Sequence, residues 1–596
     1  LPSENLVTLD GITLYHMDHA FGILSAVPTS IVKDVQLYKS NFPAKFGGKL
    51  SGVVEMTGKN GDFQKAHIDF ETNEMAAQGM VQVPVMDYAT ILLSGRHSLN
   101  TYLARNLYKT INQTPPFIND FIQTTSENDV TDNPTPEITF WDTYAKISLT
   151  PTSKDLVNFS FFRSQDIMSA NRGDLNAFSS REWIWSNSGL SASWFRAWDK
   201  TFQTDLQVTQ SAYKINQDSS AVEGLYGASD QASRVKNSID DFSIKLDNQW
   251  DGIKNHSFSF GYQFKKVKTD FVEWHPQFAR ILTHGIEAQQ NIFYLQDDWQ
   301  ISDHLKMRPS LRITHFDLAD KYFYSPRLAA NYSLTKSIQL KASAGQYHQF
   351  VSNFGYEFPN YIGQLNWLVN DNTVLKPGRS NHYTIGFNWN GKLFDIDMEY
   401  YHKQSKGIIE QINTISAGNV IIPALVQRET KSNGIDVLLH HKNSVFDGWL
   451  SYSYNSSKIN IPAGAPYPLS GETPHSLKAI AKYTLGSLVF AVSGYYTSGT
   501  PYSLPLIAEV GDGSYILTAP LNRNSERLPD ETRVDFSLNY HYPAPWYKIN
   551  LGISIYNLFD QQNTWYKNFS VQDGQLISKD VNKLGFTPTV FLRFSF

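Results

Sequence analysis

Apolar and polar side chains alternate at every second position through most of this chain, and no other feature restricts its fold as strongly. The closing residues, TVFLRFSF, place Val590, Leu592 and Phe594 on one side of an extended chain and Arg593 and Ser595 on the other. A period of two is typical of a β-strand with one apolar face. Similar segments recur from residue 63 to the end, whereas helical periodicity is weak. The sequence therefore predicts an all-β protein.

The connections between these segments alternate in length. Short polar turns are expected at 152–155, 199–201, 251–255, 302–304, 334–337, 390–392, 485–487 and 542–545. Longer connections are expected near 99–138, 170–180, 220–235, 351–375, 409–425, 461–472, 503–530 and 563–586. A sheet connected in this way has one short-turn end and one long-loop end, as transmembrane barrels do. We expect an antiparallel barrel of about 22 strands, an even number as in bacterial single-chain barrels.

The composition fits this fold and excludes several others. Aromatic residues make up 14% of the chain, and tryptophans stand near expected strand ends, where indole rings suit a membrane–water interface. No apolar run approaches the roughly 18 residues of a membrane-spanning helix. There is no cysteine, hence no disulfide or thiolate site, and a formal net charge of -5 gives no basic field for nucleic acid.

A large secreted β-protein is the competing interpretation. A propeller would repeat with a period of about 40 to 50 residues, and the chain shows no such self-similarity. Tandem sandwich domains would be separated by linkers rich in proline or serine, and no such linker divides the chain. The barrel therefore remains the expected fold.

Residues 1–61 differ from the remainder of the chain. The stretch FPAKFGGKLSGVVEMTGKNG (residues 42–61) is rich in glycine, including Gly47, Gly48 and Gly52, and alternates less regularly. Barrels of this size enclose a lumen too wide for their own side chains to fill, and are plugged. We expect these glycines to let the chain turn tightly inside the lumen. A glycine-rich hairpin of a small soluble domain is the alternative.

Several separated motifs resemble the TonB-dependent outer-membrane receptors, in the form common in Bacteroidota. NLVTLDGITLY (5–15) and IVKDVQLYKSNFPAKFGGKLSGVVEMTGKNG (31–61) resemble plug strands of that family. IFYLQDDWQIS (292–302), YSPRLAANYSLT (324–335), SGTPYS (498–503), RVDFSLNYHY (533–542) and ISIYNLFDQQN (553–563) resemble its barrel strands, and Phe596 its aromatic C-terminus. The resemblance implies that residues 1–61 are the C-terminal half of a plug domain and residues 62–596 the barrel.

The same resemblance implies a function and partners. A scarce nutrient, here expected to be a metal chelate such as a ferric siderophore, would be captured at the surface of a Gram-negative cell and imported into the periplasm. Energy would come from TonB and its inner-membrane motor through an N-terminal segment of the receptor. The given sequence does not contain that segment, and we therefore expect the native chain to be longer. The lipid bilayer, lipopolysaccharide and a surface lipoprotein are further expected partners, whereas no cofactor and no nucleic acid are expected.

The expected apex of the plug, LYHMDHAFG (residues 14–22), supplies the first set of candidate ligand contacts: Tyr15, His16, His19 and Phe21. His16 and His19 stand beside a thioether and a carboxylate, a donor set that could hold a transition metal. Such short clusters often occur without ligand geometry. The alternative is that both histidines are merely hydrogen-bonded within the fold.

The connection NFGYEFPNYIGQLNW (residues 353–367) supplies the second set: Phe354, Tyr356, Tyr361 and Trp367. Rigid aromatic side chains bury a large area at small entropic cost, which suits capture of a flat or amphipathic ligand. Packing of this loop onto its neighbours is an equally good explanation of these residues.

Enzymatic functions have no support in the sequence. The chain contains no G-x-S-x-G, H-E-x-x-H, Walker or G-x-G-x-x-G motif, and no catalytic residue is assigned. Two other functional classes remain beside the siderophore importer. One is an importer of an oligosaccharide or peptide, and the other is a transport-inactive barrel that acts as a subunit of a surface complex.

Overall fold

The wall strands run in sequence order around a single closed sheet. The computed structural model describes residues 4–101, 104, 137–173, 177–223, 231–275, 280–354, 366–415, 421–461, 464–509, 515–518 and 522–596. The strands up to β17 are β7 (His67–Thr72), β8 (Ala76–Met86), β9 (Ala89–Ser98), β10 (Glu137–Leu149), β11 (Asp155–Gly173), β12 (Ala177–Ala197), β13 (Phe202–Glu223), β14 (Gln231–Trp250), β15 (His256–His275), β16 (Arg280–Gln300) and β17 (Leu305–Phe316). The others are β18 (Lys321–Ser333), β19 (Ile338–Gln349), β22 (Gly378–Asn390), β23 (Phe394–Ile415), β24 (Ile421–His441), β25 (Phe446–Asn460), β27 (His475–Leu485), β28 (Leu488–Thr497), β33 (Glu531–Pro543), β34 (Lys548–Tyr556) and β37 (Thr587–Ser595).

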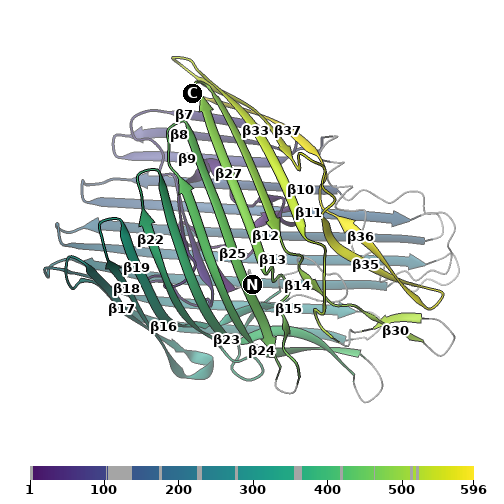
Figure 1. Ribbon diagram of the computed structural model, residues 1–596. Helices are drawn as coiled ribbons and strands as arrows, with labels where there is room; N and C mark the ends of the chain where they lie inside the picture. The colour runs from purple at the N-terminus through teal and green to yellow at the C-terminus, as the bar shows by residue number, and fades with distance from the viewer. Residues whose placement is uncertain are drawn as a thin grey trace.

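The sheet is an antiparallel barrel that closes on itself (Figure 1). The last strand, β37, pairs with β7, so that Leu592 lies opposite Thr72. A two-residue segment, β26 (Tyr467–Pro468), pairs with the end of β25, which also pairs with β27, so β26 adds no strand to the wall. The barrel thus has 22 strands, and the predicted fold class is confirmed.

Several wall strands are longer than expected. Loops were predicted at 170–180, 220–235 and 409–425, but strand pairing continues into these regions and β12, β13 and β23 reach 21, 22 and 22 residues. A membrane crossing needs only about 9–11 residues. Beyond the membrane layer, continued strand pairing provides hydrogen-bond partners for the backbone N–H and C=O groups. One connection at the long-loop end is shorter than the alternation of turns and loops predicts. Only the short 3₁₀ turn η5 (Asp317–Ala319) and Asp320 join β17 to β18.

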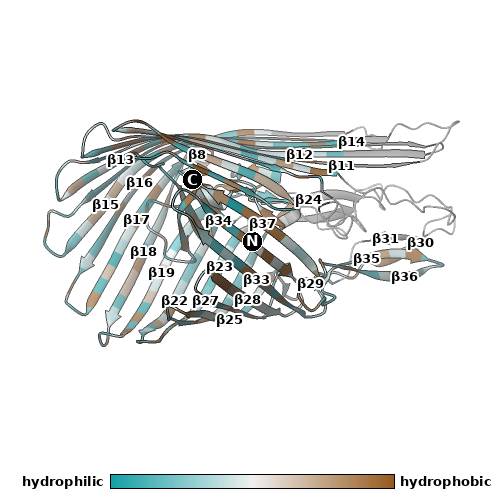
Figure 2. Cartoon of the chain, turned by 90° about the horizontal axis from the view of Figure 1, so that it is seen from above, coloured by the Kyte–Doolittle hydropathy of each residue, from teal (hydrophilic) through white to brown (hydrophobic). Residues whose placement is uncertain are grey.

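The wall shows the predicted two-residue alternation. In β16, Phe293 and Leu295 are more than half exposed on the outside, whereas Tyr294 and Gln296 are buried on the inside. Figure 2 shows apolar stretches along wall strands such as β33 and β37. The exposed tryptophans Trp198, Trp250, Trp299 and Trp546 stand at or beside the short-turn ends of strands. Inside and outside are therefore inverted relative to a soluble barrel, with apolar residues facing outward.

An inner segment, residues 4–58, lies within the barrel (Figure 1, purple). Its four-stranded sheet has the order β2-β1-β6-β5, and β1 and β6 are parallel. The core is located between this segment and the wall, where Leu9 and Ile12 pack with Tyr144 and Phe162. The elements are β1 (Asn5–Leu9), β2 (Ile12–Thr13), β3 (Asp18–His19), η2 (Ala20–Gly22), β4 (Leu24–Ser25), η3 (Thr29–Ile31), β5 (Val32–Tyr38) and β6 (Gly52–Gly58).

Short hairpins decorate the long-loop end of the barrel. They pair β20 (Val351–Phe354) with β21 (Asn366–Val369), β29 (Pro501–Tyr502) with β32 (Glu526–Arg527), β30 (Leu506–Glu509) with β31 (Tyr515–Thr518), and β35 (Thr564–Gln572) with β36 (Gln575–Asn582). Within the described ranges, no helix has the length and apolar character needed to cross a membrane.

Candidate functional site

The apex of the inner segment turns its side chains into the barrel wall. The Tyr15 hydroxyl donates a 2.6 Å hydrogen bond to Asp241 on β14, and the backbone of Tyr15 and His16 is held by Asn187 on β12. Tyr15 is buried, and burial beside Asp241 raises the pKa of its hydroxyl well above its usual value. The hydroxyl therefore stays protonated and acts as a donor.

His19 is fully buried and joins two wall strands. Its Nδ1 lies 2.7 Å from Asp166 on β11, and its Nε2 lies 2.9 Å from Asp142 on β10. Arg96 on β9 also binds Asp142, and the ring stacks on Phe140 at 4.3 Å. Burial alone lowers the pKa of His19, but the two carboxylates outweigh it and raise the pKa to about 8. At neutral pH this histidine is thus a cation between two carboxylates.

A second polar cluster lies around Asp10, in the two-residue turn between β1 and β2. Asp10 has φ 50° and Gly11 φ 83°, the left-handed pair that tight hairpin turns require. The carboxylate accepts hydrogen bonds from Tyr144, Ser160, Lys146 and the Gly58 backbone. Lys146 is almost completely buried. One short turn therefore holds the inner segment to β10 and β11.

His16 differs from its neighbours, because neither ring nitrogen makes a hydrogen bond within the described part of the chain. The ring stacks with Tyr213 at 6.2 Å and meets Trp185 edge-on at 5.6 Å, and the closest carboxylate, Asp18, is 3.7 Å away. Burial lowers the pKa of His16, which favours the neutral imidazole. Phe21 belongs to η2, and the structure does not describe its side chain.

A metal site at His16 and His19, which the sequence analysis left open, finds no geometric support. Both ring nitrogens of His19 are already engaged by carboxylates, and His16 and His19 contact different wall residues. Among the described residues, no group of three or more histidine, aspartate or glutamate side chains could hold a metal ion. We therefore carry the metal hypothesis no further.

The hairpin β20–β21, here called the capping hairpin (351–354 and 366–369), folds onto the apex of the inner segment. Trp367 meets Tyr15 edge-on at 5.0 Å, and the Lys49 ammonium lies 4.3 Å from the centre of the Trp367 ring. Phe354 packs against Phe271 on β15. The side chains of Phe354 and Trp367 are buried. Tyr356 and Tyr361, the other two predicted loop contacts, lie outside the described residues.

Asn237 on β14 holds the capping hairpin. Its side chain accepts a 2.7 Å hydrogen bond from the Trp367 amide and donates a 3.0 Å bond to the Trp367 carbonyl. Asn237→Ala leaves both backbone groups buried without this partner, at about 1–3 kcal/mol each. We expect amide exchange of 366–369 to become roughly tenfold faster or more, measured by hydrogen-exchange mass spectrometry. The exposed wall residue Asn331 offers the control Asn331→Ala, and equal exchange in both variants would contradict this assignment.

Two buried arginines of the wall bind the glycine-rich loop. Arg312 donates to the carbonyls of Ala44 and Lys45, and Arg327 donates to those of Phe42 and Phe46. A Cβ on Gly47 would lie 2.4 Å from the Arg312 side chain, so this approach requires glycine. Gly48 has φ 76°, and a Cβ on Gly52 would lie 2.8 Å from the Tyr38 carbonyl oxygen.

The wall residues of these clusters were not predicted from the sequence. Asp142, Tyr144 and Lys146 share one face of β10 because they stand at every second position. The sequence signal that could have identified these wall residues is the presence of charged side chains at the strand positions that face the lumen. Together these contacts anchor the inner segment to the barrel wall.

The comparisons with known proteins agree with this architecture. The family model described as TonB dependent receptor-like, beta-barrel matches residues 113–558. Among proteins with curated descriptions, none matches the sequence significantly.

Solved structures extend the likeness to the whole chain. The outer membrane transporter YddB from Escherichia coli is 13% identical with a TM-score of 0.69, covering 100% of this chain and 90% of that one. A mutant of the ferric enterobactin receptor PfeA from Pseudomonas aeruginosa is 12% identical with a TM-score of 0.70, covering 100% and 90%. The siderophore receptor PirA from Acinetobacter baumannii is 13% identical with a TM-score of 0.67, covering 100% and 91%. At these identities the structural likeness supports the fold. The family match, which spans more than half of the sequence, shows that this chain belongs to the TonB-dependent receptors, a family of outer-membrane receptors and transporters rather than enzymes.

Proposed function

We propose that this protein imports a metal chelate such as a ferric siderophore across the outer membrane, with energy delivered through TonB. The observation that carries the proposal is how the inner segment occupies the barrel. It is anchored to the wall through charged and polar clusters around Asp10 and His19. Water can replace such contacts when the segment is pulled away, which an entirely apolar interface would resist.

In this proposal residues 1–61 are the C-terminal half of a plug and residues 62–596 the barrel. The long loops face the outside, and the short turns and the C-terminus face the periplasm. TonB and its inner-membrane motor act on the plug through a segment N-terminal to it. The outer membrane holds neither ATP nor an ion gradient, so bound ligand must signal across the lumen by shifting the plug between conformations. The long loops in this proposal also bind a surface lipoprotein.

We place the ligand contacts at the capping hairpin and the apex beneath it. Trp367 lies directly on Tyr15, so a ligand that lifts the hairpin gains access to the apex. His16 is the apex residue best suited to meet it, since its ring nitrogens make no hydrogen bond within the described structure. Tyr15 and His19 are engaged by the wall, and their contribution to binding requires that these contacts rearrange. Phe21, Phe354, Tyr356 and Tyr361 remain proposed contacts. The solved neighbours named as siderophore receptors support the substrate class.

The test uses the full-length protein in an outer membrane. Cells that express it are grown in iron limitation with radiolabelled ferric siderophores of different chemistry, with and without functional TonB. We expect TonB-dependent uptake of at least one chelate, and roughly tenfold weaker binding in His16→Ala, about the effect of one lost hydrogen bond. The matched control is His304→Gln, at an exposed turn on the short-turn end.

The other outcomes decide between the alternatives. Binding of a chelate without TonB-dependent uptake would contradict active import and favour a transport-inactive subunit of a surface complex. Failure to bind any chelate, together with binding of an oligosaccharide or peptide, would overturn the substrate class while leaving the family unchanged.

A further inference from the structure

An open apolar groove lies on the outer face of the barrel wall, across β14–β17. Its volume is about 830 Å³, within the roughly 300–1,000 Å³ of pockets for drug-sized molecules. Phe260, Phe293, Leu295 and Leu311 line it with apolar surface, and Asp297 is the outward-facing carboxylate among its lining residues. We propose that this groove binds one phospholipid with a primary ammonium head group, such as phosphatidylethanolamine, whose ammonium contacts Asp297. The proposal does not depend on which nutrient is transported.

The apolar lining faces away from the lumen. Phe293 and Leu295 are more than half exposed on the outside of β16. Leu295 lies directly opposite Phe260 on β15 and Leu311 on β17, and residues opposite each other in a sheet share one face. Since the chain belongs to a family of outer-membrane barrels, the outside of its wall contacts lipid. The occupant of the groove is therefore a lipid.

The groove extends from the short-turn end of the wall toward its middle. Trp250 and Trp299 are exposed at that end, and indole rings favour the level of lipid head groups. Asp297 stands beside Trp299 along β16, and the distance from Asp297 to Phe293 is about 13 Å at the rise of a β-strand. A lipid with its head group at the level of the tryptophans therefore lays an acyl chain along Leu295 and Phe293.

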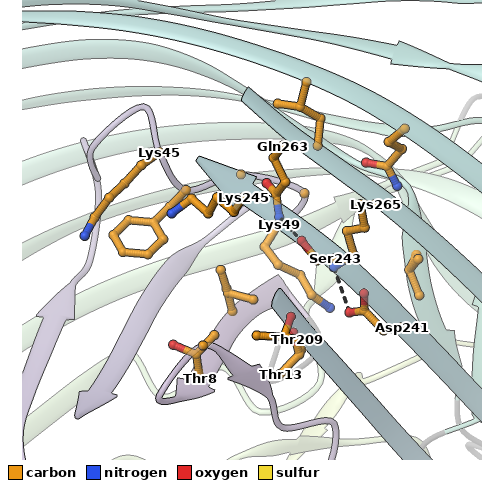
Figure 3. Close-up of a pocket in the computed structure, with 18 of the residues that line it drawn as sticks. Thr8, Thr13, Lys45, Lys49, Thr209, Asp241, Ser243, Lys245, Gln263 and Lys265 are labelled. Atoms are coloured by element: carbon orange, nitrogen blue, oxygen red, sulfur yellow. Dashed lines mark hydrogen bonds and ion pairs between the residues drawn. The ribbon is translucent and has the colours of Figure 1, made fainter. Parts of the chain in front are cut away.

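Asp297 has capacity for a further hydrogen-bond donor. Its Oδ2 lies 2.7 Å from Nδ1 of His256, whereas its Oδ1 makes no hydrogen bond within the described residues. A carboxylate can accept about four hydrogen bonds, and a charge next to hydrocarbon is costly unless it is paired. Inside the barrel, by contrast, Asp241 contacts both Lys265 and Tyr15 at the cavity shown in Figure 3. On the outer face, a lipid head group can supply the missing donor.

The charge of the lining selects the head group. Of the described residues that line the groove, Asp297 and Arg327 are charged. Arg327 points into the barrel, where it donates to the carbonyls of Phe42 and Phe46. The outward surface of the groove is thus negative, so it repels an anionic head group and attracts an ammonium. A primary ammonium also carries three N–H donors, which a trimethylated one lacks.

The surroundings of Asp297 suit the remainder of a head group. The His256 ring stacks on Phe258 at 5.6 Å and on Trp299 at 5.3 Å, which holds the partner of Asp297 in place. The register of β16 with β17 is interrupted beside Asp297, where Pro309 has no backbone N–H to donate. Backbone groups outside a regular ladder require other polar partners in a membrane. The phosphate and ester groups of a phospholipid are such partners.

The test titrates the detergent-solubilised full-length protein with phosphatidylethanolamine, phosphatidylglycerol and phosphatidylcholine that carry identical acyl chains, and counts bound lipids by native mass spectrometry. We expect one phosphatidylethanolamine to bind with a Kd roughly tenfold below those of the other two lipids, about the effect of one charge-assisted hydrogen bond. Asp297→Asn keeps an acceptor for His256 but removes the charge, and should abolish this preference. Asp303→Asn, at an exposed short turn of the same end, should retain it.

A second variant tests the apolar part of the site. Leu295→Trp fills part of the groove and should weaken the binding of all three lipids by similar factors, whereas Asp297→Asn should act on phosphatidylethanolamine alone. Two results would overturn the proposal. One is equal affinity of the wild type for phosphatidylethanolamine and phosphatidylglycerol. The other is an unchanged preference in Asp297→Asn protein, whose folding is verified independently by its heat-dependent mobility on gels.

Discussion

Replacing Asp10 by alanine will loosen the inner segment from the barrel wall. The carboxylate accepts hydrogen bonds from Tyr144, Ser160, Lys146 and the Gly58 amide, and Lys146 is almost fully buried. Removing one partner of a buried ion pair leaves an uncompensated charge, which costs about 3–5 kcal/mol. We expect much faster amide exchange in β1, β2 and β6, and an increased ion conductance of the protein in planar bilayers.

Two further variants separate the causes of this effect. Asp10→Asn retains a residue that tolerates the left-handed turn but removes the charge, so it reports the loss of the ion pair with Lys146. Asp34→Ala removes an exposed carboxylate from β5 of the same inner segment and should have little effect. Unchanged amide exchange in the Asp10→Ala variant would show that the apolar contacts of Leu9 and Ile12 alone hold the segment.

Raising the pH from 6 to 9 will weaken the attachment of the apex of the inner segment. The pKa of His19 is raised from 6.5 to about 8 in the folded protein, because its hydrogen bonds to Asp142 and Asp166 outweigh burial. A raised pKa stabilises the attached state fully below about pH 6.5, and this stabilisation disappears as the pH rises through about 8. The difference corresponds to about 2 kcal/mol.

The measurement is hydrogen exchange of residues 15–25 as a function of pH, corrected for the intrinsic exchange rate. His19→Gln cannot take up the proton and should lose this pH dependence, whereas His304→Gln at an exposed turn should retain it. Lys49 acts in the opposite direction, since its lowered pKa makes the folded state more stable as the pH rises above about 7. The difference between wild type and His19→Gln isolates the histidine. Exchange of residues 15–25 that accelerates with rising pH as strongly in His19→Gln as in wild type would contradict this role.

The interior side of the wall strands shows how far the candidate site could be predicted. In WDTYAKIS (141–148), Asp142, Tyr144 and Lys146 recur at every second position, which marks a polar face directed into the lumen. The apex histidines were likewise visible in the sequence. Which of them would meet which wall residue was not, because Tyr15 and Asp241 are 226 positions apart and His19 and Asp142 are 123 apart. No local pattern specifies contacts over such separations.

The connection 351–375 illustrates the same limit. Its aromatic residues were equally consistent with ligand capture and with packing. Asn237 and Thr269 on the wall bind the backbone of Trp367 and Val369 and so draw this hairpin onto the inner segment. The strand extensions beyond the expected loops also depend on pairing with neighbours, such as Ser179 of β12 with Ala221 of β13.

The sequence by itself determined the class of the fold, because alternation with a period of two and the alternation of short and long connections are local properties that specify an antiparallel barrel with two unlike ends. It also determined that the first residues differ from the wall, through their glycines. The tertiary structure alone decided how that segment is held. Closing the barrel brings strands from distant parts of the chain around one lumen. Only there does Asp10 meet Lys146, and only there do His19 and Lys49 meet the charges that act on their protonation.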